Sequence, residues 1–364
     1  MNKVIDKLLI FDAHCDTANV LIRDSYYFIE ENKSHLNNIK IKEGGLKAQI
    51  FAIWVNASYP LEKSEKKALL LYDTLEKKIF NPGYGIKVTS TSEMDIALKN
   101  KKLACWIFLE GGHIIENSIE KLNSFYSIGV RGMTLVHMKN TDWADSSGDN
   151  PKWNGLNNLG RKIIKKMNEI GMAIDVSHSS DKTVEDVLQI TSKPIMASHS
   201  CARSLCNIPR NIPDNLIKEI AESEGFIGIN FFPGFLSKKI YNQLMKNLEK
   251  NKKWYDEKMK EYKKNTEMLD KTDIELFKKM VVGNDKVDSN AVIDHIAHVA
   301  DIGGIDCVGL GSDFDGIPSA PTDLTDVSCY PNLVNNLSER GFKLKEIEKI
   351  MGLNLYNLLK KINK

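Results

Sequence analysis

Short apolar segments recur along the chain and alternate with segments that have helical spacing. The apolar segments are nearly continuous in hydrophobic residues, which is typical of parallel strands that are buried on both faces. Between them, residues 157–171 and 213–225 place apolar side chains three or four positions apart, and each segment ends at a Gly suited to a helix C-terminus. We expect buried strands at Leu8–Ala13, Leu46–Val55, Leu103–Leu109, Val130–Val136, Met172–Val176, Pro194–Ala197, Phe226–Phe231 and Cys307–Leu310.

This alternation predicts the fold class. About eight strands with intervening helices favour an α/β fold of the (β/α)8 TIM barrel type over a doubly wound sheet. Residues 236–282 break the alternation, because they are rich in Lys and Glu and have helical periodicity without a strand. We interpret them as a helical insertion after the seventh strand, with a solvated charged face in preference to a binding patch. Because no linker divides the sequence, we expect a single domain over residues 1–364.

Composition narrows the classes of partner. The 364 residues are 42% hydrophobic, and 50 basic against 48 acidic residues leave a net charge of +2. This balance gives no electrostatic footprint for nucleic acid and no polybasic membrane anchor. No apolar stretch approaches the roughly 18 residues of a membrane span, and the N-terminal segment lacks the features of a signal peptide. The six cysteines show no CxxC spacing, which favours reduced thiols. We expect a soluble cytoplasmic protein, and the sequence leaves a homodimer open.

Side chains that bind metals or transfer protons follow six of the expected strands. Barrel enzymes carry their chemistry where the strands end. A lone His at a strand end is more often a satisfied buried polar group, but a buried polar group without a partner costs about 2–7 kcal/mol. A metal centre would satisfy six such strand ends together, so the pattern favours one. The residues are His14, Asp16, Glu110, His137, His178, His199 and Asp313.

The residue types indicate the kind of metal. His14 and Asp16 project to the same face of a strand, because side chains two positions apart do so. Imidazole and carboxylate without thiolate suit Zn²⁺ or another borderline divalent ion. His178 and His199 come from different strands and resemble the ligands of a second ion, and Glu110 has two oxygens with which it could bridge both. Two ions about 3.5–4 Å apart would hold a shared hydroxide, as in two-metal hydrolases.

Several segments along the chain form a specific combination, although each alone would be weak. They include FDAHCDT, LEGGH, LVHMKNTDWADSS, AIDVSH, PIMASHSCARSLCNIPRNIPD, GFIGINFFPGFL and VGLGSDFDGI. Together they resemble the membrane (renal) dipeptidase family, peptidase family M19, within the amidohydrolase-like metallohydrolases, and the resemblance covers the chain from about Leu8 to Leu359. It implies a (β/α)8 barrel with two zinc ions that cleaves dipeptides and accepts a D residue at the C-terminal position.

The resemblance also implies the metal ligands. His14 and Asp16 would bind one zinc ion, and His178 and His199 would bind the other. Glu110 would bridge the two ions and so belong to both the metal and the catalytic residues.

Three further residues receive roles by the same resemblance. His137 would polarise the substrate and stabilise the oxyanion, and Asp313 would accept a proton from water and pass it to the leaving amine. Arg210 would bind the substrate carboxylate, since a guanidinium recognises a carboxylate through two parallel hydrogen bonds. From the sequence alone, Arg210 could instead be a surface residue that caps the next helix.

Other reactive residue types fit structural roles better. Cys15 lies between two predicted ligands, so strand alternation turns it to the opposite face and away from a base. His295 and His298 fall in a predicted helix before the eighth strand, and His113 falls in a loop near the barrel mouth. We leave all four out of the ligand set.

Two alternatives to a zinc-dependent dipeptidase remain open at this point. A related binuclear amidohydrolase that acts on N-acyl amino acids, cyclic amides or lactams would use the same metals. The chain could also be a binding module that kept the fold without activity, although such a module has no need for the full set of ligand-type residues.

Overall fold

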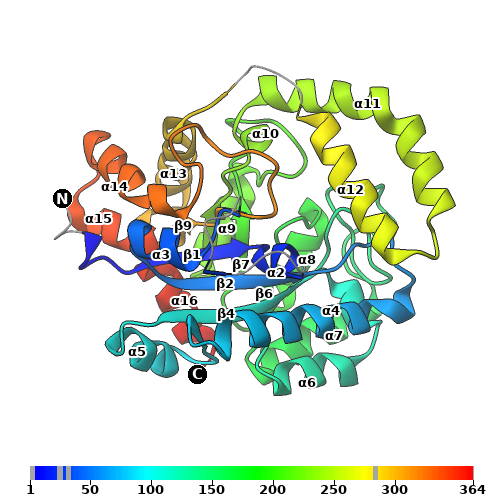
Figure 1. Cartoon of the computed structure of the whole chain (residues 1–364), viewed down its shortest axis with the longest axis horizontal. Coiled ribbons are helices and arrows are strands. Elements are labelled where there is room, and N and C mark those ends of the chain that lie inside the picture. Colours follow the sequence, from blue (N-terminus) through cyan, green and yellow to red (C-terminus); the bar gives the residue numbers. More distant parts are fainter. Residues whose placement is uncertain (1–4, 23–27, 30–33, 282–285, 364) are drawn as a thin grey trace.

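The computed structural model describes residues 5–22, 28–29, 34–281 and 286–363. Parallel strands pair side by side and close into a barrel through the pairing of β2 with β4, with helices around the outside (Figure 1). The eight barrel strands are β1 (Ile10–Cys15), β2 (Leu46–Trp54), β4 (Leu103–Glu110), β5 (Gly132–Thr134), β6 (Ala173–Asp175), β7 (Met196–Ser200), β8 (Phe226–Ile229) and β9 (Val308–Leu310). The predicted (β/α)8 barrel is therefore confirmed, and each predicted strand matches one observed strand.

One short strand was not predicted. Strand β3 (Gly85–Lys87) pairs with Leu103–Cys105 at the start of β4, whereas β5 pairs with Phe108–Glu110 at its end. Three residues with an exposed Ile86 carry too little hydrophobic periodicity to indicate a strand. Strand β3 therefore extends the sheet at the beginning of β4, away from the strand ends where the polar residues gather.

The helices cover the barrel and close one of its ends. Helix α7 begins behind Asn157, whose side chain accepts hydrogen bonds from the N–H groups of Leu159 and Gly160, and ends at Gly171 with φ 75°. Apolar side chains of the C-terminal helix α16 share one core cluster with Phe11, Trp106 and other apolar residues of the barrel strands, and α16 contacts β1, β8 and β9. The helices are α2 (Thr17–Leu21), α3 (Asn38–Gly44), α4 (Ser64–Leu75), α5 (Thr91–Lys99), α6 (Ile119–Ser127), α7 (Asn158–Ile170), α8 (Asp181–Ile190), α9 (Asp214–Glu222), α10 (Pro233–Leu236), α11 (Lys238–Glu261), α12 (Thr266–Met280), α13 (Ser289–Gly303), α14 (Tyr330–Glu339), α15 (Leu344–Glu348) and α16 (Asn354–Ile362).

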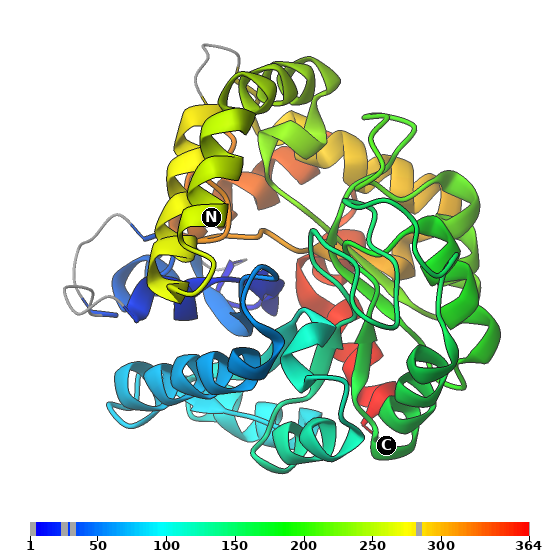
Figure 2. The ribbon, with the colours of Figure 1, turned by 90° about the vertical axis from the view of Figure 1, so that its right-hand side faces the viewer.

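The predicted helical insertion consists mainly of α11 and α12, which follow the seventh barrel strand, β8. Most of its Lys and Glu side chains are exposed. Two Asp side chains of α12 instead contact the segment after β2: Asn56 Nδ2 donates to Asp273, and Tyr59 Oη donates to Asp270 at 2.7 Å. Figure 2 shows α12 standing next to this segment. The insertion thus links loops that follow the second and the seventh barrel strands.

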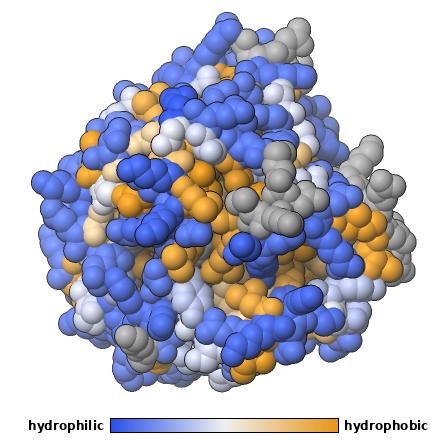
Figure 3. Space-filling view, turned by 90° about the vertical axis from the view of Figure 1, so that its left-hand side faces the viewer, coloured by the Kyte–Doolittle hydropathy of each residue, from blue (hydrophilic) through white to orange (hydrophobic). Residues whose placement is uncertain are grey.

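The composition of the helices, the state of the cysteines and the hydropathy of the surface describe the protein further. Among the residues that the structure describes, no helix combines the length and the apolar composition needed to span a membrane. All six cysteines are free, and five of them are buried. Figure 3 faces the side of the molecule opposite to that of Figure 2, and hydrophilic residues surround hydrophobic ones near its middle.

Candidate metal centre and active site

The predicted site residues converge at the C-terminal ends of the barrel strands. Three of them belong to the strands β1, β4 and β7, and one follows β1 directly. The remaining three follow β5, β6 and β9, each at the third position after the last strand residue. These seven residues are His14, Asp16, Glu110, His137, His178, His199 and Asp313, and Arg210 lies in the loop after β7.

Two of these residues have a strained backbone. His178 has φ 64° and Asp313 has φ 62°, a left-handed conformation that costs a residue with a side chain about 1–3 kcal/mol. Hydrogen bonds to other elements stabilise both turns. The Asp313 N–H donates to the carbonyl of His14 at 3.2 Å, and the His178 carbonyl accepts from the N–H of Ser147 at 2.8 Å. Such conformations cluster at functional sites, where the surrounding structure maintains them.

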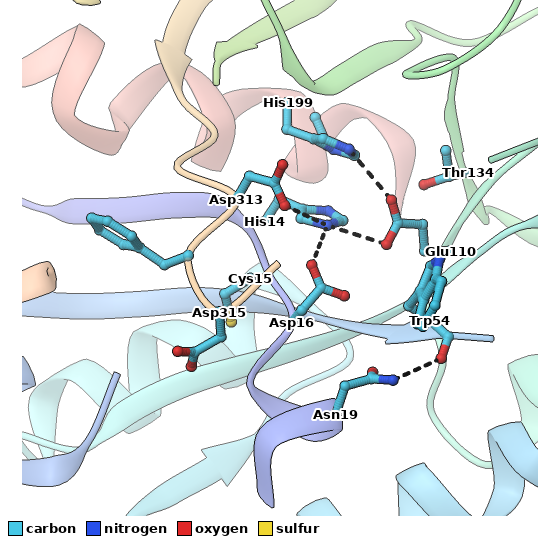
Figure 4. A network of polar contacts seen from close by, with 12 residues as sticks. His14, Cys15, Asp16, Asn19, Trp54, Glu110, Thr134, His199, Asp313 and Asp315 are labelled. Carbon is cyan, nitrogen blue, oxygen red and sulfur yellow. Dashed lines mark hydrogen bonds and ion pairs between the residues drawn. The ribbon is translucent and has the colours of Figure 1, made fainter. Parts of the chain in front are cut away.

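The carboxylate of Glu110 occupies the centre of the site (Figure 4). Its Oε2 atom lies 3.4 Å from His14 Nε2, and its Oε1 atom lies 3.3 Å from His178 Nε2 and 3.4 Å from His199 Nε2. Burial alone would raise the pKa of Glu110, but the surrounding imidazoles outweigh burial and hold that pKa well below its usual range. The two oxygens of one carboxylate therefore face two different sets of donor atoms.

The first set surrounds His14. Its Nε2 atom lies 3.4 Å from Asp16 Oδ2 and 4.0 Å from Asp313 Oδ1. Burial and the nearby Glu110 carboxylate raise the pKa of Asp16 to about 8, although His14 counteracts them. Carboxylates that crowd around one imidazole repel one another, and a bound cation would offset this repulsion.

The second set is formed by His178 and His199, whose Nε2 atoms lie 2.9 Å apart. The Ser198 hydroxyl donates its single proton to Asp175 Oδ2 at 2.5 Å and lies 2.7 Å from His199 Nδ1. The hydroxyl must therefore accept from His199 Nδ1–H, which leaves a lone pair on His199 Nε2. A second ring nitrogen that donates in this way is the usual arrangement behind a metal-binding His.

These side chains fit a divalent metal ion. The buried His14 Nε2 atom, which faces Glu110 and Asp16, forms no hydrogen bond with any residue that the structure describes. Imidazole and carboxylate groups without thiolate suit Zn²⁺ and similar ions. Three groups of three residues bring their ligand atoms within 4.8 Å of one another: His14, Glu110 and His199; Glu110, His137 and His178; and His14, Asp16 and Asp313.

Arg210 is a buried cation next to this cluster. Its side chain donates to Ser200 Oγ at 2.9 Å and to the carbonyl oxygen of His199 at 2.7 Å, and its guanidinium lies 5.2 Å from the ring centre of Phe235. Only 9% of the residue is exposed, so Arg210 is not a surface capping residue. No carboxylate of the described residues forms an ion pair with Arg210, and its Nε–H lacks a partner there as well. A buried positive charge of this kind favours an anionic ligand.

Two residues of the site were missed in the sequence, one at each strand for which no functional side chain was predicted. Trp54 ends β2, and its indole N–H donates to His137 Nδ1 at 3.2 Å. Asn230 follows β8 and donates from Nδ2 to Asp313 Oδ2 at 2.9 Å, while its Oδ1 accepts from the N–H of Phe232 at 2.7 Å. Each lies one residue before the end of a predicted strand, Leu46–Val55 or Phe226–Phe231, so both could have been found by considering every hydrogen-bonding side chain near a strand end, and not only those of ligand type.

The other reactive residue types contact structural partners. His295 accepts from the N–H of Ala202 at 3.0 Å, and His298 pairs with Asp214 at 2.9 Å. Burial raises the pKa of the Cys15 thiol well above its usual range, which disfavours the thiolate. His113 is half-buried, and desolvation lowers the pKa of its imidazole to about 4. None of the four belongs to the groups of possible metal ligands among the described residues.

Comparison with known families shows to which of them the chain belongs. Residues 1–364 match the family described as membrane dipeptidase (Peptidase family M19). The chain belongs to this family of hydrolases that act on dipeptides, which confirms the resemblance seen in the sequence. Membership of the family implies a metal cofactor, in agreement with the donor atoms around Glu110.

Individual relatives are similar over different lengths. The dipeptidase tcpJ of Claviceps purpurea is 34% identical over 265 residues, which cover 72% of this chain and 52% of that protein. An uncharacterized dipeptidase of Schizosaccharomyces pombe is 29% identical over 376 residues, which cover 97% of this chain and 80% of that protein. The match thus spans about half the length of the Claviceps relative.

Solved structures share the fold. The probable dipeptidase PvdM from Pseudomonas aeruginosa superposes with a TM-score of 0.87 at 22% identity, covering 100% of this chain and 97% of that one. A metallopeptidase from Rhodobacter sphaeroides, liganded with a phosphinate mimic of the dipeptide L-Ala-D-Ala, gives a TM-score of 0.79 at 22% identity, covering 97% and 99%. At this level of identity the likeness supports the barrel fold alone.

Gly316 provides a test of the carboxylates beside His14. A Cβ atom at Gly316 would overlap with Asp16 Oδ2 and Asp313 Oδ1. We expect Gly316→Ala to displace both carboxylates, lower the metal content and reduce turnover about 10²-fold, because small displacements of reacting groups have effects of this size. Elemental analysis measures the metal content and kinetics the turnover, and thermal unfolding checks that the variant is folded. Ser319→Ala, on the same loop, is the control and should behave as wild type; unchanged metal content and turnover in Gly316→Ala would contradict the described geometry.

Proposed function

We propose that this protein is a zinc-dependent dipeptidase that hydrolyses the peptide bond of L-L and L-D dipeptides. The observation that carries the proposal is the position of Glu110, whose two oxygens face two donor sets next to the buried guanidinium of Arg210. The donor sets suit a pair of divalent ions, and the cation suits the free carboxylate of a small substrate. Family membership supports the same substrate class.

Two Zn²⁺ ions are the proposed cofactor. His14 and Asp16 would hold one ion, His178 and His199 the other, and Glu110 would contact both. When bound, such ions supply Lewis-acid activation of the attacking water and of the scissile carbonyl at neutral pH.

His137 and Asp313 supply hydrogen bonding and proton transfer from the chain itself. Burial lowers the pKa of His137 to about 4, so its imidazole is neutral at neutral pH and donates an N–H to the oxygen on which negative charge develops. Asp313 accepts the proton of the attacking water and passes it to the leaving amine. Asn230 holds one oxygen of Asp313, which leaves the other oxygen facing His14.

Arg210 orients the substrate and measures its length. A dipeptide places its C-terminal carboxylate one residue beyond the scissile bond, where a fixed guanidinium can bind it. The Rhodobacter sphaeroides metallopeptidase carries a mimic of L-Ala-D-Ala, and this supports acceptance of a D residue at the C-terminal position. An N-acyl amino acid also presents a free carboxylate, so a binuclear amidohydrolase for such substrates is the alternative that a substrate panel excludes.

The other sequence-based expectations stay predictions. We propose a cytoplasmic location, which the six free cysteines support, since free thiols persist in reducing compartments. A homodimer remains a proposal in the same sense.

Metal removal tests the cofactor. Dialysis against a chelator should abolish hydrolysis of L-Ala-L-Ala and L-Ala-D-Ala, and added Zn²⁺ should restore it. Asp16→Ala and His178→Ala should each lower the zinc content by about one ion, whereas Glu110→Ala should disturb both ions. His298→Ala, which removes a His paired with Asp214 at the surface, is the matched control and should retain both ions. Full activity of the metal-free protein would contradict the proposal, and turnover restricted to N-acyl or cyclic amides would favour the alternative.

Asp313→Asn tests the proton transfer. The new amide can keep its oxygen toward Asn230 and its shape in the site, but it cannot accept a proton. We expect kcat to fall about 10²-fold or more, with zinc content little changed. Steady-state kinetics and elemental analysis are measured on the same preparation. Wild-type kcat in this variant would assign Asp313 a structural role only.

Arg210→Met tests recognition of the carboxylate. Loss of a charge-assisted hydrogen bond of about 1.5–3 kcal/mol should lower kcat/KM for a free dipeptide roughly 10- to 150-fold, mainly through KM. A C-terminally amidated dipeptide should be poor for wild type, and the variant should no longer distinguish it from the free acid. Arg340→Met is the control, because Arg340 pairs with Asp294 at the surface and contacts no residue of the site. If Arg210→Met keeps the wild-type preference for the free acid, another residue binds the carboxylate.

A further inference from the structure

Trp54 contacts the site without belonging to the predicted ligand set. It is the last residue of β2 and pairs in register with Glu110 of β4. Its indole N–H lies 3.2 Å from His137 Nδ1, and the two rings meet edge to face, with centres 5.6 Å apart and an interplanar angle of 73°. Asn19 Nδ2 donates to the Trp54 carbonyl at 3.2 Å, which fixes the backbone at the strand end (Figure 4).

The chemistry of this contact determines where His137 carries its proton. An indole N–H only donates, so His137 Nδ1 must accept and carries no proton. A neutral imidazole has one N–H, which is then at Nε2. The ring centre of His137 lies 4.4 Å from that of His178, so this imidazole stands at the edge of the metal cluster.

The neighbouring His199 has the opposite tautomer. Its Nδ1–H donates to Ser198, so its Nε2 atom carries a lone pair for a metal ion. A protonated Nε2 on His137 cannot bind a metal ion, although His137 lies close enough to Glu110 and His178 to be grouped with them. The hydrogen bond from Trp54 leaves His137 with a donor at Nε2, whereas the hydrogen bond to Ser198 leaves His199 with a lone pair at Nε2. These two bonds therefore distinguish a hydrogen-bond donor from a metal ligand.

We propose that Trp54 is a positioning residue that holds His137 in the Nε2–H tautomer, which excludes His137 from the metal ligands and keeps its N–H for the substrate oxygen. Only the role of the N–H toward the substrate oxygen rests on the proposed function; the tautomer and the exclusion from the metal ligands do not. With the other tautomer, a lone pair on Nε2 would face the developing negative charge and would not stabilise it.

The kinetic test uses Trp54→Phe, which keeps an aromatic ring and removes the N–H donor. We expect kcat for L-Ala-D-Ala to fall about 3- to 10-fold with KM little changed, the effect of one neutral hydrogen bond that acts through another group. Trp153→Phe is the matched control, because it removes an indole N–H that donates to the carbonyl of Thr141 at 3.0 Å, and it should keep wild-type kcat. In a His137→Ala background, Trp54→Phe should have no further effect, since Trp54 acts through His137. A full additional loss in that background would overturn the proposal.

The spectroscopic test does not depend on activity. The zinc-loaded full chain is labelled with ¹⁵N-histidine, and the two ring nitrogens of His137 are assigned by their loss in His137→Ala. We expect a protonated Nε2 and an unprotonated Nδ1 in wild type and in Trp153→Phe, and averaging between the tautomers in Trp54→Phe. A protonated Nδ1 in wild type, or an Nδ1 in Trp54→Phe that is unchanged from wild type, would overturn the positioning role. If the tautomer behaves as expected while no dipeptide is hydrolysed, the proposed function fails and the role of Trp54 stands.

Discussion

The contact of one buried carboxylate with three imidazoles determines the arrangement of this site. Glu110 lies within 3.4 Å of the Nε2 atoms of His14, His178 and His199, and each of its oxygens faces a different donor set. The position of Glu110 is fixed by its pairing with Trp54 of β2 and Thr134 of β5, so the central group stands on a rigid part of the barrel. A closed parallel barrel brings all its strand ends around one opening, which is why groups far apart in the sequence can meet there.

Two further buried carboxylates support the strands that carry the ligands. Asp12, two residues before His14, accepts hydrogen bonds from the Ser312 N–H at 2.9 Å and from Tyr330 Oη at 2.7 Å, and so links β1 to the loop after β9. Asp175 accepts from the Ser198 N–H at 2.9 Å and thereby links β6 to β7. Because both carboxylates have several donors, the rings above them are held in place before any ligand binds.

The barrel fold and the residues at its strand ends could be predicted from the sequence, because a buried parallel strand is apolar along its length and a polar residue at its end is conspicuous. The barrel was predicted in this way, and Glu110 and His199 lie at the strand ends where the pattern placed them. Contacts between elements could not be predicted. The hydrogen bond from Trp54 to His137, and that from Asn56 to Asp273, join residues 83 and 217 positions apart, and no periodicity records such a pair.

Backbone conformation was the other feature that the sequence did not reveal. His178 and Asp313 lie three residues beyond their strands, in turns with positive φ that favour Gly on local grounds. At these two residues the tertiary structure therefore overrides the general preference for negative φ. Tertiary hydrogen bonds to Ser147 and His14 maintain these turns, and a single sequence contains no sign of them.

The central claim is that Glu110 stands between two metal ions. The most direct test is a crystal of the zinc-loaded protein, measured with X-rays on both sides of the zinc absorption edge. The account predicts two anomalous peaks, one next to His14 and Asp16 and one next to His178 and His199, with the Glu110 carboxylate between them. A single peak, or peaks that leave Glu110 without contact to a metal ion, would contradict it.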